Sequence, residues 1–248
     1  MEQIVAAVLA LVGMNIVVAT ANAIVSRSHW GPLRWFWRAT SIVGVPVHEL
    51  SHWLMANLMG FRVNRTVLLQ WSNPDMPMGW VEYSYPTRGL TVQLRLFLVG
   101  LAPAVVFAII FSSISAKLFP GLPGVAADAV AGLAAGHWAP AWGLVAALAA
   151  ATAQDAGTAA ILLLLCVTAM HAAPSWADLR SAVPGGIMLI CGAGVVLGLL
   201  GHMNHGQQLA GMIAGALASA LAVVGLGAGL AAALAVIALI ASAVQRQR

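Results

Sequence analysis

The longest stretch of the chain without a charged side chain runs from Ser181 to Gln245, a length of 65 residues. A single helix of that length would measure about 98 Å, roughly three times the thickness of the hydrocarbon core of a bilayer. The stretch is therefore expected to fold back on itself. The turn-like sequence GHMNHG at 201–206 is the natural place, which predicts apolar helices near 185–200 and 209–244.

Charged residues are scarce in the whole chain as well. Apolar residues make up 61% of the 248 positions and charged residues only 7%, whereas a typical soluble domain is about 25% charged. These proportions argue against an ordinary soluble enzyme, a disordered chain and a coiled coil. The net charge is +4 and no block of Lys or Arg occurs, so we expect no nucleic-acid partner.

Charge-free runs predict the fold class, an all-α polytopic membrane protein with about six to seven transmembrane helices. The expected unit is one integral membrane domain over residues 1–248, with the lipid bilayer as a partner. The expected location is that of an integral multi-pass protein of a bacterial inner membrane. Besides the two C-terminal helices, the predicted spans are 3–26, 39–61, 96–116, 129–154 and 156–177.

The most polar part of the chain follows the second predicted span and covers residues 62–95. It contains two β-like segments, Val63–Trp71 and Trp80–Tyr85. The turn-rich residues 72–77 lie between them and include Asn73-Pro74-Asp75. This order predicts a small β-hairpin inserted after the preceding helix, at the membrane surface.

The motif that carries chemistry is His48-Glu49-Leu50-Ser51-His52, an HExxH sequence. On a helix, positions i and i+4 share one face, so both imidazoles can reach one metal ion. Glu49 lies beside that ion and can take a proton from a water molecule that the metal activates. A composition of 7 His and 3 Glu would produce HExxH by chance with a probability of roughly 0.002.

A catalytic zinc site needs a third protein ligand and one open position. Asp178 is the leading candidate because it follows Pro174, where a helix is expected to end. His171, seven residues earlier, is the second candidate. The remaining His, Asp and Glu residues look like loop, surface or interfacial groups: His29, Asp75, Glu82, Asp128, His137, Asp155, His202 and His205.

An HExxH helix in an apolar setting, followed by a polar β-like stretch, resembles the site-2 protease group of zinc-dependent intramembrane metalloproteases. The resemblance covers a core of about residues 39–180. It implies that His48 and His52 ligate zinc and that Glu49 is the catalytic base. The segment from His171 through Pro174 to Asp178 is similar to the family's second motif, although Leu179 stands where the family has Gly.

On that resemblance Asp178 would be the third zinc ligand. His171 would be a catalytic residue that contacts the substrate or the oxyanion, with a ligand role as the alternative. The implied activity is a metalloendopeptidase that hydrolyses a peptide bond of a transmembrane or membrane-associated protein. Two other interpretations stay open: a metal-handling transporter, and a non-catalytic membrane scaffold with a protease-like shell. A cluster of polar residues that only joins two helices is the structural alternative to a metal site.

Overall fold

The computed structural model describes residues 16–27, 31–71, 77–87, 89–118, 155–171 and 173–200, together with scattered positions at 13, between 125 and 153, and between 232 and 244. A helical segment at 16–26 comes first. The elements with defined bounds are then α2 (Gly31–Leu58), β1 (Arg62–Val67), β2 (Trp80–Ser84), α3 (Leu90–Leu118), α6 (Ala156–Met170) and α7 (Trp176–Leu200).

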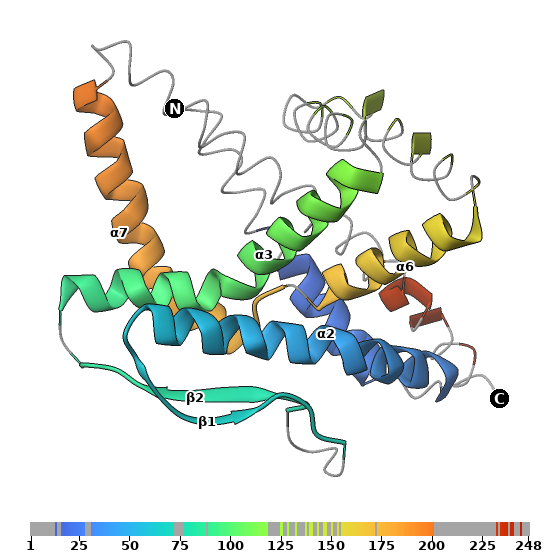
Figure 1. The fold of residues 1–248 in the computed structure, drawn as a ribbon, viewed down its shortest axis with the longest axis horizontal. Helices are drawn as coiled ribbons and strands as arrows, with labels where there is room; N and C mark the ends of the chain where they lie inside the picture. The colour runs from blue at the N-terminus through green and yellow to red at the C-terminus, as the bar shows by residue number, and fades with distance from the viewer. Residues whose placement is uncertain are drawn as a thin grey trace.

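Helix α2 is the element on which the others assemble. The hairpin of β1 and β2 lies along one side of α2, while α3 and α6 lie on the other side (Figure 1). Helix α7 packs mainly against α3. The HExxH motif lies in the second half of α2, so its side chains are within reach of both the hairpin and the helices opposite.

The C-terminal end of α2 is set by Gly60, whose φ of 72° is the left-handed conformation that glycine adopts without strain. The amide of Phe61 donates to the carbonyl of Ala56, and the amide of Gly60 to that of Asn57. This pair of hydrogen bonds is a Schellman motif. Phe61 then packs on Ala56, which turns the chain sharply back into β1.

The antiparallel hairpin confirms the predicted β segment, with a shorter first strand than expected. Arg65 pairs with Glu82, so opposite charges face each other across the strands. A register shift between Val63 and Arg65 marks a bulge. The ring of Tyr83 stacks on Phe61 with the centroids 5.7 Å apart, and this contact ties the hairpin to the end of α2.

Helices α3 and α7 approach very closely, and glycines allow it. A Cβ atom at Gly185 would lie 2.0 Å from the carbonyl oxygen of Gln93, and one at Gly100 would lie 2.8 Å from the carbonyl oxygen of Asp178. Both distances are far below van der Waals contact. The small residues therefore bring the first turn of α7, which carries Asp178, against α3.

The predicted helix break at Pro174 is confirmed. Helix α6 ends at Met170 and α7 begins at Trp176. His171 is the C-terminal cap of α6, with its amide bonded to the carbonyls of Ala169 and Thr168. The short connection turns the chain beside α2, so that the residues on either side of it face the HExxH motif.

The predicted membrane spans are not supported. Over the residues that the structure describes, no helix combines the length and the apolar character needed to cross a bilayer. This finding contradicts the all-α polytopic membrane fold with six to seven transmembrane helices. It equally contradicts the expected location, that of an integral multi-pass protein of a bacterial inner membrane.

For the predicted spans 156–177 and 39–61, the reason is the length of the helix in one case and its charged residues in the other. Helix α6 has 15 residues and is about 22 Å long, shorter than the roughly 30 Å of a hydrocarbon core. Helix α2 has 28 residues but carries Arg34, Arg38 and Glu49. Half of the predicted span 3–26, and most of those at 129–154 and 209–244, lie outside the described residues.

Candidate metal centre

The two histidines of the HExxH motif point to the same place. They lie one turn apart on α2, and their Nε2 atoms are 3.1 Å from each other. Both side chains are largely buried, with 12% of His48 and 6% of His52 exposed. The helical i, i+4 relationship thus brings two imidazole nitrogens together as the sequence predicts.

Asp178 lies in the first turn of α7, where a capping box with Ser175 holds its side chain. The amide of Ser175 donates to Oδ2 of Asp178 over 2.7 Å, and the amide of Asp178 donates to Oγ of Ser175 over 3.2 Å. This reciprocal pair satisfies two amides at the helix start and fixes the carboxylate rotamer. Oδ2 then lies 3.6 Å from Nε2 of His48 and 3.3 Å from Nε2 of His52.

The three potential ligand atoms form a nearly equilateral triangle with edges of 3.1, 3.3 and 3.6 Å. A tetrahedral zinc ion with bonds of about 2.0 Å has ligand atoms about 3.3 Å apart. The described residues therefore include a His-His-Asp group, His48, His52 and Asp178, that could hold a metal ion. A tetrahedral ion bound there would keep one position free, as catalytic sites require.

Hydrogen bonds behind the histidines determine which nitrogen faces the centre. Nδ1 of His48 donates to the carbonyl of His171 over 2.7 Å, and Nδ1 of His52 donates to the carbonyl of Val99 over 2.8 Å. Because a carbonyl only accepts, each Nδ1 carries a proton. In the neutral imidazoles both Nε2 atoms then present lone pairs, and a cation is the complement to two lone pairs and a carboxylate.

Asp178 stays ionised in this position. Burial alone would raise the pKa of Asp178, but hydrogen bonds from the imidazoles of His48 and His52 outweigh burial and hold that pKa well below its usual range. Such hydrogen bonds form only when a histidine carries a second proton, on Nε2 as well as on Nδ1. A metal ion at the same point replaces that proton, so the donor set fits a divalent cation.

Glu49 is buried beside the group without belonging to it. Burial is the main cause that raises the pKa of Glu49 to about 7; His48 lowers that pKa and Asp178 raises it. Gly79, just before β2, allows the hairpin to lie against this side chain, because a Cβ there would be 2.6 Å from Cγ of Glu49. A carboxyl group tuned to neutral pH is suited to exchange protons.

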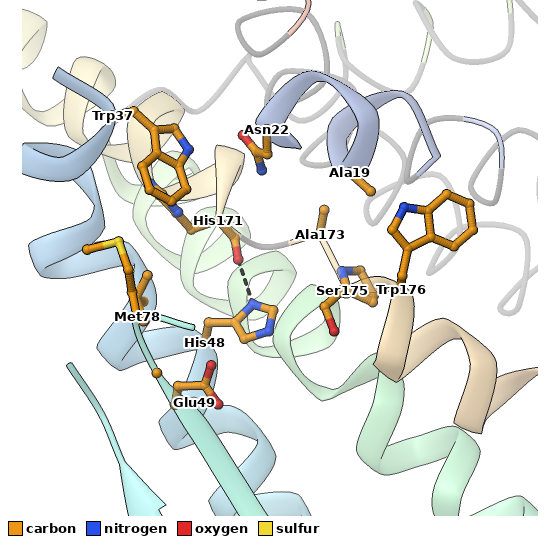
Figure 2. Close-up of a pocket in the computed structure, with 13 residues that line it drawn as sticks. Ala19, Asn22, Trp37, His48, Glu49, Met78, His171, Ala173, Ser175 and Trp176 are labelled. Carbon is orange, nitrogen blue, oxygen red and sulfur yellow. Dashed lines mark hydrogen bonds between the residues drawn. The ribbon is translucent and has the colours of Figure 1, made fainter. Parts of the chain in front are cut away.

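A cavity of about 280 Å³ opens beside His48 and Glu49. Figure 2 shows these two side chains from α2 facing the segment that joins α6 to α7, with Ser175 and Trp176 on the far side. The other lining residues are mostly apolar: Ala19, Asn22, Trp37, Val45, Met78, Gly79, His171, Ala173 and Pro174. The cavity therefore gives a bound molecule access to the carboxyl group of Glu49.

His171 lies next to the group but does not present its ring to it. Its Nε2 is 3.1 Å from Oγ1 of Thr40, and that hydroxyl donates to the carbonyl of Trp37. Burial, with a smaller contribution from His48, lowers the pKa of His171 to about 4, so the ring is neutral. The structure thus brings its main-chain carbonyl, rather than its imidazole, to the candidate ligands.

The remaining sequence candidates that the structure describes do not belong to this group. Asp155 is the N-cap of α6 and accepts from the amide of Thr158. Glu82 is exposed on β2 and accepts from Nε1 of Trp80. Asp128 and His137 are exposed, and four others lie outside the described residues: His29, Asp75, His202 and His205.

Sequence reasoning missed two kinds of contribution. The sequence Ser175-x-x-Asp178 is a capping-box pattern, and this signal could have placed Asp178 at a helix start. The carbonyls of His171 and Val99 leave no such signal, since every residue has a carbonyl.

Comparison with known proteins found no relative of this chain. No protein-family model matches the chain, and no curated protein and no solved structure matches it.

Proposed function

We propose that this protein is a zinc-dependent endopeptidase, with His48, His52 and Asp178 as the metal ligands and Glu49 as the general base. The observation that carries the proposal is the triangle of two Nε2 atoms and one carboxylate oxygen, 3.1 to 3.6 Å on each edge. Glu49 follows the first of these ligands directly in the chain and lines the adjacent cavity.

Each residue has a distinct part in the proposed reaction. A divalent cation at the triangle would supply a Lewis acid and lower the pKa of water to about 7. Glu49 accepts the proton of the attacking water at its carboxylate and delivers it to the leaving amine. The carbonyls of His171 and Val99 hold the two imidazoles, so that their Nε2 lone pairs stay aimed at one point.

The hairpin favours a substrate in extended form. Gly79 and the start of β2 lie against Glu49, and no third strand pairs with the sheet among the described residues. An extended peptide can add to such an edge through main-chain hydrogen bonds, which tolerate many sequences and expose the scissile carbonyl. The proposed substrate class is therefore an unfolded or locally unwound protein segment.

The test combines metal content with hydrolysis. Purified protein reconstituted with zinc is incubated with a library of unstructured peptides, and new termini are identified by mass spectrometry. We expect cleavage by the unmodified chain. Glu49→Gln should keep its zinc and lose at least about 100-fold in rate, because it keeps the shape of the side chain but cannot take a proton.

Asp128→Asn is the control, since it makes the same carboxylate-to-amide change at an exposed position outside the hairpin. It should cleave as the unmodified chain does. Cleavage that survives in the Glu49 variant at the normal rate would contradict the role of Glu49 and favour a contaminating protease. Bound zinc without cleavage of any peptide would favour a metal-handling or non-catalytic protein.

A further inference from the structure

The ring of His171 occupies a space that exists only because residue 44 is glycine. A Cβ atom built on Gly44 would lie 2.3 Å from Cδ2, 2.4 Å from Cγ and 2.6 Å from Cβ of His171. Gly44 is buried in α2, one turn before His48. The connection between α6 and α7 therefore rests directly on the backbone of the HExxH helix.

The close approach has a consequence for the ligand His48. The carbonyl of His171 accepts the hydrogen bond from Nδ1 of His48 over 2.7 Å. The ring, Cβ and carbonyl belong to one residue, so a group on α2 that pushed Cβ of His171 away would move the carbonyl as well. Thr40 holds the other side of the ring, at 3.1 Å from Nε2.

A side chain at position 44 could not be absorbed by a rotation of the His171 ring. Cβ of His171 is itself within 2.6 Å, and ordinary contact begins at 3.4 Å. The main chain of His171 would have to retreat by roughly the difference, about 0.8 Å. A hydrogen bond of 2.7 Å lengthened by that amount reaches the limit at which such a bond is recognised.

We propose that Gly44 is a positioning residue of the metal centre: its missing side chain leaves room for His171 against α2 and so keeps the carbonyl of His171 within hydrogen-bond reach of Nδ1 of His48. The imidazole of His171 fills this space and is not a ligand. The inference rests on the metal site of the proposed function, but not on the hydrolysis of peptides. A glycine inside a helix is destabilising relative to alanine, which fits a position that needs the space.

The test is a cycle of variants measured by zinc affinity, using competition with a chromophoric chelator. Gly44→Ala should bind zinc about 10- to 100-fold more weakly, the usual effect of losing the group that orients a ligand. His171→Gly keeps the carbonyl and removes the ring, and it should bind within a few-fold of the unmodified chain. The double variant should match His171→Gly, because the added methyl group then meets no side chain.

Gly186→Ala is the control for crowding between helices. A Cβ there would meet ring atoms of Phe97 at 3.0 and 3.2 Å, away from all candidate ligands. It should leave zinc affinity unchanged. The visible spectrum of the cobalt-substituted protein is the second measurement, since it responds to ligand geometry: Gly44→Ala should alter it and the double variant should restore it.

Three results would overturn the inference. A double variant as weak as Gly44→Ala would show that the clash with His171 is not the cause. Loss of zinc in His171→Gly would make the ring a ligand or a necessary support. Unchanged zinc affinity in Gly44→Ala would remove any positioning role.

A third measurement does not depend on the metal. Nitrogen chemical shifts in the metal-free protein report which nitrogen of His48 carries the proton. The unmodified chain and the double variant should be protonated at Nδ1, and Gly44→Ala should show a mixture. If no form of the protein bound metal, the proposed function would fail. The chemical shifts of His48 would then decide the role of Gly44 on their own.

Discussion

The two halves of the candidate metal centre are built in different ways. His48 and His52 belong to one helix, and their separation of one turn is fixed by helical geometry. Asp178 comes from the start of another helix, held by Ser175 and by the approach of α7 to α3 at Gly100. The first half depends on local structure, whereas the second depends on tertiary packing.

The two halves of such a site are sensitive to different substitutions. A change in the α2 half removes a ligand but leaves the scaffold in place. A change in the α7 half can act through the cap, the packing or the ligand, and these effects can be separated by the choice of substitution. The predictions below test this division, beginning with the largest expected effect.

His52→Ala should abolish zinc binding at micromolar metal. His52 is the most buried of the three candidate ligands, and loss of a ligand should exceed the roughly 10- to 100-fold effect of losing an orienting group. Elemental analysis of the purified protein measures this directly. His137→Ala, at an exposed position, should keep its metal, and equal zinc in the two variants would break the assignment of the α2 half.

Asp178→Asn should separate the two duties of that residue. Asparagine still accepts from the amide of Ser175, so α7 should keep its cap, but a neutral amide is a poor zinc ligand. We expect zinc affinity to fall more than about 100-fold while the melting temperature of the metal-free protein barely changes. The reverse pattern would make Asp178 a structural cap only.

Asp178→Ala should lose both properties, since it removes the ligand and the cap together. Loss of a cap typically costs about 1 kcal/mol, so the metal-free variant should melt at a lower temperature than Asp178→Asn. Asp155→Ala, which removes the cap of α6, is the comparison. It should leave zinc binding intact.

Gly100→Ala should destabilise the protein through the packing of α3 on α7. Its Cβ would meet the carbonyl oxygen of Asp178 at 2.8 Å and Cβ of Ala182 at 2.9 Å. Overpacking costs about 1 to 3 kcal/mol, and the helix propensity of alanine offsets up to about 1 kcal/mol. Denaturant unfolding should show a net loss of about 1 to 2 kcal/mol. Gly192→Ala, with nothing within 4 Å, should be neutral or stabilising.

The smallest expected effect concerns the pH dependence of the cap at Asp155. Hydrogen bonds from the side chain and the amide of Thr158 lower the pKa of Asp155. A lowered folded-state pKa gives stability that is present above the unfolded-state pKa of about 3.9 and is lost as the pH falls through the folded value. Asp155→Asn should therefore melt slightly below the unmodified chain at pH 7, and the difference should vanish near pH 2.

Local patterns in the sequence predicted the local parts of the structure. The HExxH spacing placed two imidazoles together, Pro174 marked a helix break, and the turn-rich residues 72–77 between two β-like segments marked a hairpin. Asp178 could be singled out because a carboxylate just after a helix break is able to turn inward. Each of these inferences depends on neighbours within a few residues.

The inferences that failed or went untested depend on the whole chain. Charge-free runs predicted membrane spans, a prediction that the described helices contradict. The seat of His171 on Gly44 joins positions far apart in the chain, and no spacing rule connects them. Nor does any pattern reveal that His171 contributes a carbonyl, which is a property of the fold and not of its side-chain type.

The separation of the two halves along the chain has a further consequence, which concerns the unfolded state. His48 and His171 lie 123 positions apart, and Asp178 is more distant still. An ion bound by ligands from both α2 and α7 would close a loop of that size. In the chain-entropy model, a covalent link across about 100 residues raises the free energy of unfolding by roughly 4 to 5 kcal/mol. The unfolded chain cannot hold the ion with ligands from both helices at once. The binding free energy of the ion therefore adds to the free energy of unfolding of the whole protein. A cation bound there would cross-link α2 to α7 in addition to acting as a Lewis acid.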